Sequence, residues 1–243
     1  MSDVANTSLA TGLVEYWELD ETSGNRVGSH ASISLTDNNT VGYTTGVIGN
    51  AASFVASNNE YLRSTDSALQ VTTDISWAGF VKPEAAVTRL ALWNTFSSSP
   101  GVAGLISTFE KNGSNFNFRF ANYVGGSGKD HTFSTVFTVS ELAHVVFTYD
   151  ISAGTVKLYK NGSLVETVTG FSTSITSKST ATFGNDGNTG AGNYYNGTLD
   201  LMGLWGRLLT DAEALALYNS GSGIPYDAGG APTVYNALAL CNF

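Results

Sequence analysis

The chain has 243 residues, of which 13% are charged, and its formal net charge is −9. Its 11 lysines and arginines are scattered singly and form no basic stripe, which excludes nucleic acid as a partner and argues against an anionic membrane. The single cysteine, Cys241, cannot form an internal disulfide, and a chain of this length can hold its fold with a hydrophobic core alone.

The N-terminal residues predict neither export nor a membrane anchor. Residues 1–6 have no basic start and no apolar run, so no secretory signal peptide is predicted. No stretch of the chain reaches the roughly 18 apolar residues that a membrane span needs. We therefore expect the protein in a virion or outside the cell after lysis, and otherwise in the cytoplasm.

Strand signals dominate the chain and recur at short intervals, with polar, Gly-rich turns between them. Alternating apolar side chains predict strands over residues 74–82, 116–120, 142–149 and 155–160. In the second of these strands the phenylalanines share one face, while the polar residues between them point away. This spacing indicates an all-β protein.

Two Asn-Gly pairs, at Asn112 and Asn161, predict tight hairpins. Asn-Gly suits a type I′ turn, in which both central residues have positive φ and the twist matches that of the strands. The strands so joined span residues 105–111, 114–120, 155–160 and 163–168.

One helix is predicted at about residues 210–219. Thr210 and Glu213 have the spacing of a capping box, and Gly221 follows as a stop signal. The helix is shorter than the roughly 12–15 residues that are stable in isolation, so we expect it to lie against the sheets.

Five stretches, in order, resemble the laminin-G-like, pentraxin-like branch of the concanavalin A-type lectins and glucanases. They read GLVEYWELDE (12–21), TGVIGNAASF (45–54), ISWAGFVKP (75–83), HVVFTYD with GTVKLYKNG (144–162), and NGTLD with the segment that follows it (196–218). The resemblance implies a jelly-roll β-sandwich of two antiparallel sheets over residues 12–221. Residues 1–11 and 222–243 fall outside it and are predicted to be an N-terminal arm and a C-terminal tail.

The sequence argues against an enzyme. Glycosidases of this fold carry Glu-x-Asp-x-Glu on one strand, which holds two carboxyl groups about 5 Å apart on the same face. The chain has neither this pattern nor a Gly-x-Ser-x-Gly elbow. Its densest acidic cluster, over residues 15–21, is interpreted as a solvated strand end, and His144 as a structural histidine. A non-catalytic protein is therefore predicted.

Calcium is the metal that the resemblance raises. Relatives hold a structural Ca²⁺ near the strand that matches residues 196–200, and Asp200 occupies the ligand position. Backbone carbonyls near residues 46–49, or Glu18, could complete an oxygen shell. The chain lacks two of the family's carboxylates, because Phe54 is followed by Val-Ala and Asp200 by Leu-Met. No cofactor is predicted with certainty, and a structural calcium is left open.

A glycan site needs an aromatic ring beside amide and hydroxyl groups, since sugars present apolar C–H faces edged by hydroxyls. Three groups of residues in predicted loops have this chemistry, although Trp93 also suits the core. They are Tyr123 with Asn122, Tyr194 and Tyr195 with Asn193 and Asp186, and Trp93 with Asn94.

The favoured hypothesis is a structural accessory protein, such as a decoration, capsid or tail subunit of a virus or phage particle or of a similar surface assembly. Its partners would be neighbouring subunits, contacted through the apolar residues Val234, Tyr235, Leu238 and Leu240. The alternative is a stand-alone lectin module for cell-surface polysaccharide, with or without calcium. A glycan-active enzyme is the least favoured of the three.

Overall fold

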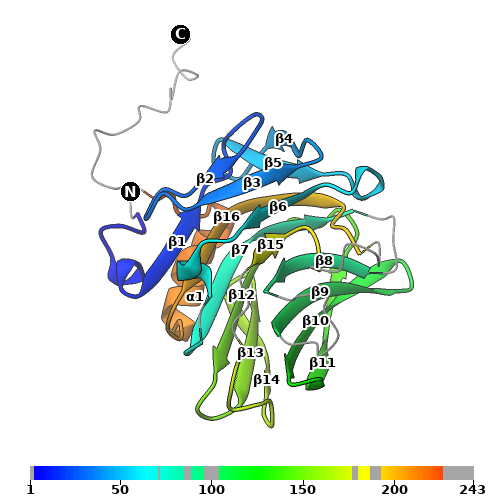
Figure 1. The fold of residues 1–243 in the computed structure, drawn as a ribbon. Helices are drawn as coiled ribbons and strands as arrows, with labels where there is room; N and C mark the ends of the chain where they lie inside the picture. The colour runs from blue at the N-terminus through cyan, green and yellow to red at the C-terminus, as the bar shows by residue number, and fades with distance from the viewer. Residues whose placement is uncertain are drawn as a thin grey trace.

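The computed structural model describes residues 3–70, 72–84, 89–95, 104–176, 180–186 and 193–226. These residues form two stacked antiparallel sheets with a short α-helix on the outside (Figure 1). The predicted jelly-roll β-sandwich is confirmed.

The first sheet has eight strands among the described residues, in the order β14-β13-β12-β7-β16-β5-β4, and β1 also pairs with β16. Their bounds are β1 (Leu13–Trp17), β4 (Gly42–Thr45), β5 (Asn50–Phe54), β7 (Ile75–Pro83), β12 (Ala143–Asp150), β13 (Thr155–Lys160), β14 (Ser163–Val168) and β16 (Gly197–Trp205).

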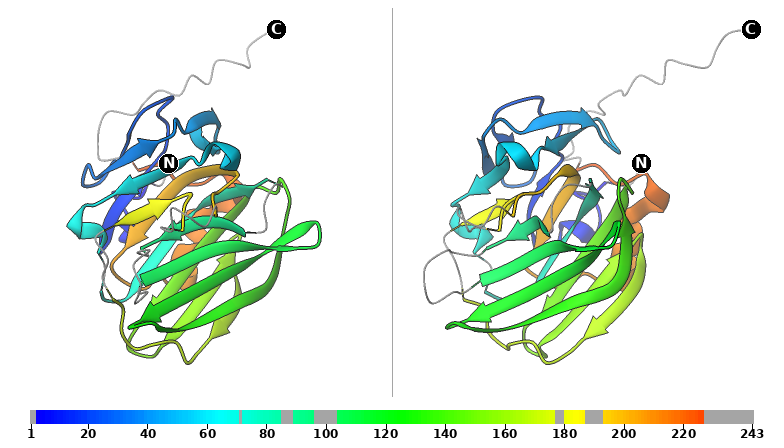
Figure 2. Two further views of the ribbon diagram at one scale, coloured as in Figure 1. Left: turned by 45° about the vertical axis from the view of Figure 1, so that its right-hand side comes forward. Right: turned by 90° about the vertical axis from the view of Figure 1, so that its right-hand side faces the viewer.

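The second sheet also has eight strands in the described ranges, in the order β11-β10-β9-β8-β15-β6-β3-β2. In Figure 2 the molecule is turned until β9, β10 and β11 come forward. The bounds are β2 (Arg26–Val27), β3 (Ser34–Asn38), β6 (Tyr61–Ser64), β8 (Arg89–Asn94), β9 (Gly104–Asn112), β10 (Asn115–Val124), β11 (Ser127–Thr138) and β15 (Ala181–Phe183).

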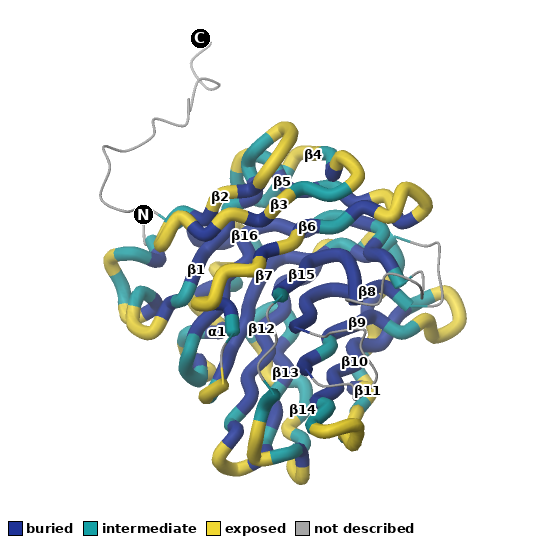
Figure 3. Tube along the Cα trace, in the orientation of Figure 1, coloured by how far each residue is buried: buried dark blue, intermediate teal, exposed yellow. Residues whose placement is uncertain are grey.

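Aromatic side chains from the inner faces of both sheets fill the core. Phe118 lies 5.8 Å from Trp77 between ring centroids, and Phe120 lies 4.2 Å from Phe147 across the two sheets. Burying each such ring stabilises the fold by about 1.5–3 kcal/mol. Buried residues therefore run through the central strands, while exposed residues gather at the turns (Figure 3).

The two predicted hairpins are present, but one turn differs in detail. Asn161 and Gly162 both have positive φ, as the type I′ prediction requires. In the other hairpin Asn112 pairs with Asn115, so the two-residue loop is Gly113-Ser114. Only Gly113 has positive φ there, which is the pattern of a type II′ turn, and the predicted turn is shifted by one residue.

The predicted helix is α1 (Asp211–Tyr218), and both hydrogen bonds of its capping box are present. The last helical residue is Tyr218, because the next residue, Asn219, takes the left-handed conformation and ends the helix before Gly221. The single-turn 3₁₀ helices are η1 (Ser8–Ala10), η2 (Ala56–Asn58), η3 (Ser67–Leu69) and η4 (Asn219–Gly221). Among the described residues, no helix has the length and hydrophobicity required to span a membrane.

A second apolar cluster seals the outer face of the first sheet. Leu9, Leu217 and Ile224 are buried there against outward-facing side chains of β1, β7 and β16. The indole N–H of Trp205 donates to the carbonyl of Leu9 at 2.7 Å, and the Tyr16 hydroxyl donates to the carbonyl of Ile224 at 2.7 Å. The described parts of the predicted arm and tail, residues 3–11 and 222–226, thus pack onto the sandwich.

Candidate functional site

The outer face of the second sheet is the open face of the sandwich. α1 lies on the first sheet, and no α-helix in the part of the chain that the structure describes covers the second. Along β10, the phenylalanines point into the core, so Asn117, Arg119 and Tyr123 point outward. Asn117 and Arg119 are nevertheless only 8% exposed and Tyr123 is half-buried, so only part of this face is accessible to a ligand.

The register of the second sheet sets outward-facing residues from seven strands in one row across this face. Each residue in the row pairs directly with its neighbour on the next strand. From β11 to β3, the row consists of Asp130, Ala121, Ile106, Asn94, Thr182, Arg63 and Thr36. Strands distant in sequence thus place amide, hydroxyl and charged groups side by side. Asp130, Arg63 and Thr36 are exposed, whereas Asn94 and Thr182 in the middle of the row are buried.

An aromatic pair with polar neighbours lies at one end of β6. The rings of Tyr61 and Tyr194 are 6.2 Å apart, and Tyr194 forms a β-bridge with Asn185. The Asn193 side-chain amide donates to the carboxylate of Asp186 at 2.6 Å. Burial, with Tyr61 and Asp186 nearby, raises the pKa of the Tyr194 phenol, which therefore stays neutral at physiological pH. The structure brings three of the predicted glycan residues together here and adds Tyr61.

A chain of charges occupies the same face on β8, β9, β10 and β11. The Arg119 guanidinium lies 2.6 Å from the carboxylate of Asp130 and 3.9 Å from that of Glu110, which also pairs with Arg89 at 2.5 Å. Arg119 is only 8% exposed. Although burial opposes its charge, the hydrogen bond to Asp130 raises the pKa of Arg119 above its usual value. Tyr123 lies beside it, with its hydroxyl 3.4 Å from the guanidinium.

Six of the eight predicted glycan residues are buried, among them Tyr194 and Asp186, and the other four of these serve the fold. Trp93 and Tyr195 belong to the aromatic core, so neither ring presents a face to solvent. Asn122 shares the inward face of β10, where its amide donates to the Tyr149 hydroxyl at 2.7 Å. Asn94 donates to the carbonyl of Asn185 at 2.9 Å and positions the segment that leads to Asp186 and Tyr194. Asn122 lies two residues after Phe120, so the alternation of side chains along β10 predicts that it points into the core.

Asp200 caps a turn from a buried position. One carboxylate oxygen accepts the Val47 N–H at 2.6 Å, and the other, Oδ1, has no hydrogen-bond partner. Burial raises the pKa of Asp200 to about 7. Asp20 accepts the Asn50 N–H at 2.6 Å from the other side of the same turn.

A calcium site at the turn between β4 and β5 would need several oxygen ligands from the protein. Calcium takes six to eight oxygen ligands. The described residues contain no group of three or more acidic, His or Cys side chains placed to hold a metal. Asp20 and Asp200 are two carboxylates at this turn, and each already accepts a backbone N–H.

His144 is buried beside Phe80 and Tyr218, and burial lowers its pKa to about 3, which keeps the ring neutral. The predicted assembly contacts lie outside the described residues; they are Val234, Tyr235, Leu238 and Leu240.

Residues 56–214 match the family model of the concanavalin A-like lectin/glucanases superfamily. The chain belongs to this superfamily. The match confirms the resemblance seen in the sequence and agrees with the two-sheet sandwich. No curated protein matches the chain.

Several solved structures of other proteins share the fold of this chain. Domain 4 of AbnA, an extracellular arabinanase from Geobacillus stearothermophilus solved with arabinotriose, is 18% identical, with a TM-score of 0.65 over 84% of this chain and 97% of that domain. The binding domain of botulinum neurotoxin serotype G is 14% identical, with a TM-score of 0.65 over 86% of this chain and 51% of that one. This chain thus spans about half the length of the neurotoxin domain.

A pentraxin from Limulus polyphemus is 18% identical, with a TM-score of 0.51 over 65% of this chain and 75% of the pentraxin. At these identities the likeness concerns the fold alone. The fold hosts unrelated functions, so the function of this superfamily member has to be argued from its own side chains.

Proposed function

We propose that this chain is a non-catalytic carbohydrate-binding module whose ligand lies across the outer face of the second sheet. One observation carries the proposal: the first sheet is sealed by an apolar cluster, whereas the second sheet has, at the β6 edge, the half-buried Tyr61 ring beside Tyr194, with the Asn193–Asp186 pair next to it. Carbohydrate sites combine these groups, because the ring covers the C–H face of a sugar and the polar groups bind its hydroxyls.

The charges on this face favour a neutral oligosaccharide. Arg119 and Arg89 are already paired with Asp130 and Glu110, so neither guanidinium is left to bind a uronate or a sulfate. The net charge of −9 also repels polyanionic glycans. The arabinotriose complex of the arabinanase domain supports an oligosaccharide ligand for this fold.

The acidic residues on this face support a binding role over hydrolysis. A glycosidase needs one carboxyl group that can donate a proton and a second that can act as nucleophile or base. Glu110 and Asp130 each bind an arginine instead. Both carboxylates are therefore engaged within the protein, which supports a binding role.

A glycan array probed with the full chain tests the proposal, with Tyr61→Ala as the site variant and Tyr43→Ala as the control. Tyr43 is 54% exposed on β4, in the other sheet. We expect binding to neutral oligosaccharides that weakens roughly tenfold or more in Tyr61→Ala, as loss of a stacked ring implies, and is unchanged in Tyr43→Ala. Silence across the array, or equal loss in both variants, would contradict the proposal.

A place in a virus or phage particle, as a decoration, capsid or tail subunit, stays a prediction from the sequence. The residues on which it rests lie outside the described ranges. A carbohydrate-binding face is compatible with that role, because a surface subunit can also bind polysaccharide.

A further inference from the structure

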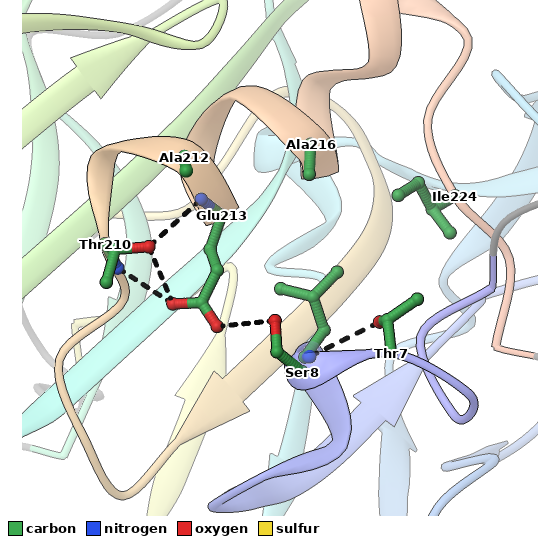
Figure 4. Close-up of a pocket in the computed structure, with 8 residues that line it drawn as sticks. Thr7, Ser8, Thr210, Ala212, Glu213, Ala216 and Ile224 are labelled. Atoms are coloured by element: carbon green, nitrogen blue, oxygen red, sulfur yellow. Dashed lines mark hydrogen bonds between the residues drawn. The ribbon is translucent and has the colours of Figure 1, made fainter.

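A groove of about 420 Å³ lies between η1 and α1 (Figure 4), on the outer face of the first sheet. Its volume falls within the range of about 300–1,000 Å³ that is typical of pockets for small ligands, so it can accept a few aliphatic side chains. The lining residues come from the N-terminal segment, the helix and the chain just beyond it. They are Thr7, Ser8, Leu9, Thr210, Ala212, Glu213, Ala216 and Ile224.

The polar groups at the rim of the groove are already satisfied within the protein. Both oxygens of Glu213 are engaged: Arg207 donates to them at 2.7 and 2.9 Å, and the Thr210 N–H donates at 2.9 Å. The Ser8 hydroxyl also donates to Glu213 at 3.1 Å. The groove therefore offers no unpaired charge. Its exposed apolar surface comes mainly from Ala212 and Ala216, above the buried Leu9 and Ile224, and it suits an uncharged, apolar occupant.

The chain leaves the described structure at the edge of this groove. Ile224 lines it, and Tyr226, two residues on, is held by a hydrogen bond of 3.1 Å from its N–H to the Glu18 carboxylate. The Tyr226 ring stacks on Tyr16 at 6.3 Å. The seventeen residues 227–243 therefore start from a fixed point next to the groove.

The sequence of this C-terminal segment matches the groove. Residues 227–232 read DAGGAP, a short linker, and residues 233–240 read TVYNALAL, with no charged side chain. Six linker residues can span about 20 Å when extended, so residues 234–240 can fold back onto the groove. A short flexible tether also gives an effective concentration in the millimolar range, which favours binding within one chain.

We propose that the groove between η1 and α1 binds the apolar residues 234–240 of the same chain. Leu238 and Leu240 supply side chains for the exposed apolar surface of Ala212 and Ala216. The C-terminal segment then extends the apolar cover of the first sheet, and its exposed hydrophobic surface is removed from solvent. This proposal is independent of carbohydrate binding, which uses the other sheet.

Disulfide trapping in the full chain tests this proposal, because Cys241 is the single cysteine and follows Leu240 directly. A second cysteine is introduced by Ala212→Cys at the groove, or by Ser114→Cys in the β9–β10 turn as the control; both positions are exposed. We expect Ala212→Cys to form an intramolecular disulfide roughly tenfold faster than Ser114→Cys, because of the local effective concentration. Non-reducing electrophoresis separates the cross-linked monomer from a disulfide-linked dimer.

A further pair of substitutions, Leu238→Asp with Leu240→Asp, is added to Ala212→Cys. The proposal predicts that this variant forms the disulfide no faster than the Ser114→Cys control, while circular dichroism shows that the sandwich is intact. Equal rates at positions 212 and 114, or a rate that the two aspartates leave unchanged, would overturn the proposal. A disulfide-linked dimer at position 212 would overturn it too, because the groove would then bind a second copy.

Discussion

Asp20 and Asp200 lie on either side of the turn between β4 and β5, and each accepts a backbone N–H of that turn. Asp200 is almost fully buried, and its Oδ1 atom has no hydrogen-bond partner. Burial penalises the charged form more than the N–H of Val47 stabilises it, which is why the pKa of Asp200 rises to about 7. One side chain thus couples the stability of the sandwich to pH.

The contribution of Asp200 to the stability of the protein should fall as the pH rises from about 4 to about 7. The unfolded chain loses the Asp200 proton near pH 3.9, whereas the folded chain keeps it up to about pH 7, so the unfolded state binds fewer protons in this window. Each pH unit should lower the free energy of unfolding by up to about 1.4 kcal/mol. Urea denaturation over this pH range, in the presence of a chelator, measures the slope.

Asp200→Asn is the variant that isolates this effect, because its amide does not titrate. Its free energy of unfolding should vary less with pH than that of the unaltered chain by about the stated slope. The same pH dependence in both proteins would show that Asp200 is not responsible. The chelator matters because a cation bound at Asp200 would hold the carboxylate in its charged form.

At the scale of the element, α1 is stabilised by its ends and by its packing. It has eight residues, too few to be stable in isolation. Thr210 accepts the N–H of Glu213, and the Glu213 carboxylate returns to the N–H of Thr210 at 2.9 Å. Ala214 and Leu217 are buried against the first sheet. The caps and the buried face together keep the helix in place.

Thr210→Ala should lower the free energy of unfolding by about 1 kcal/mol, the usual effect of removing an N-cap. Ser222→Ala, an exposed change just beyond η4, serves as the control and should stay within about 0.5 kcal/mol of the unaltered chain. Chemical denaturation of the three proteins measures both effects. A Thr210→Ala protein as stable as the control would contradict the role assigned to the capping box.

Features encoded by local chemistry could be predicted from the sequence, and features that depend on strand pairing could not. The turn at Asn161 and the capping box at Thr210 are set by a few adjacent residues, and both predictions are confirmed. Tyr61 was missed because its place beside Tyr194 comes from segments far apart in the chain. Trp93 and Tyr195 were candidates as aromatic rings in predicted loops, and only the packed core shows that both are buried.

At the scale of the whole molecule, the two outer faces of the sandwich have different roles. The face of the first sheet is covered by the N-terminal segment, α1 and residues 222–226, and the proposed binding of residues 234–240 would extend that cover. The row across the second sheet has polar residues from five of its seven strands, and three of them, Asp130, Arg63 and Thr36, are exposed. This asymmetry is the physical basis for assigning carbohydrate binding to the second sheet.

Nuclear magnetic resonance of the isotopically labelled chain, titrated with an oligosaccharide that the array identifies, locates the binding face directly. Amide resonances of β6, β8 and β15, together with those of residues 193–195, should shift as the ligand is added, and those of α1 should not. Shifts confined to α1 and residues 4–11, or no shift with any oligosaccharide, would contradict the central claim that the outer face of the second sheet binds carbohydrate.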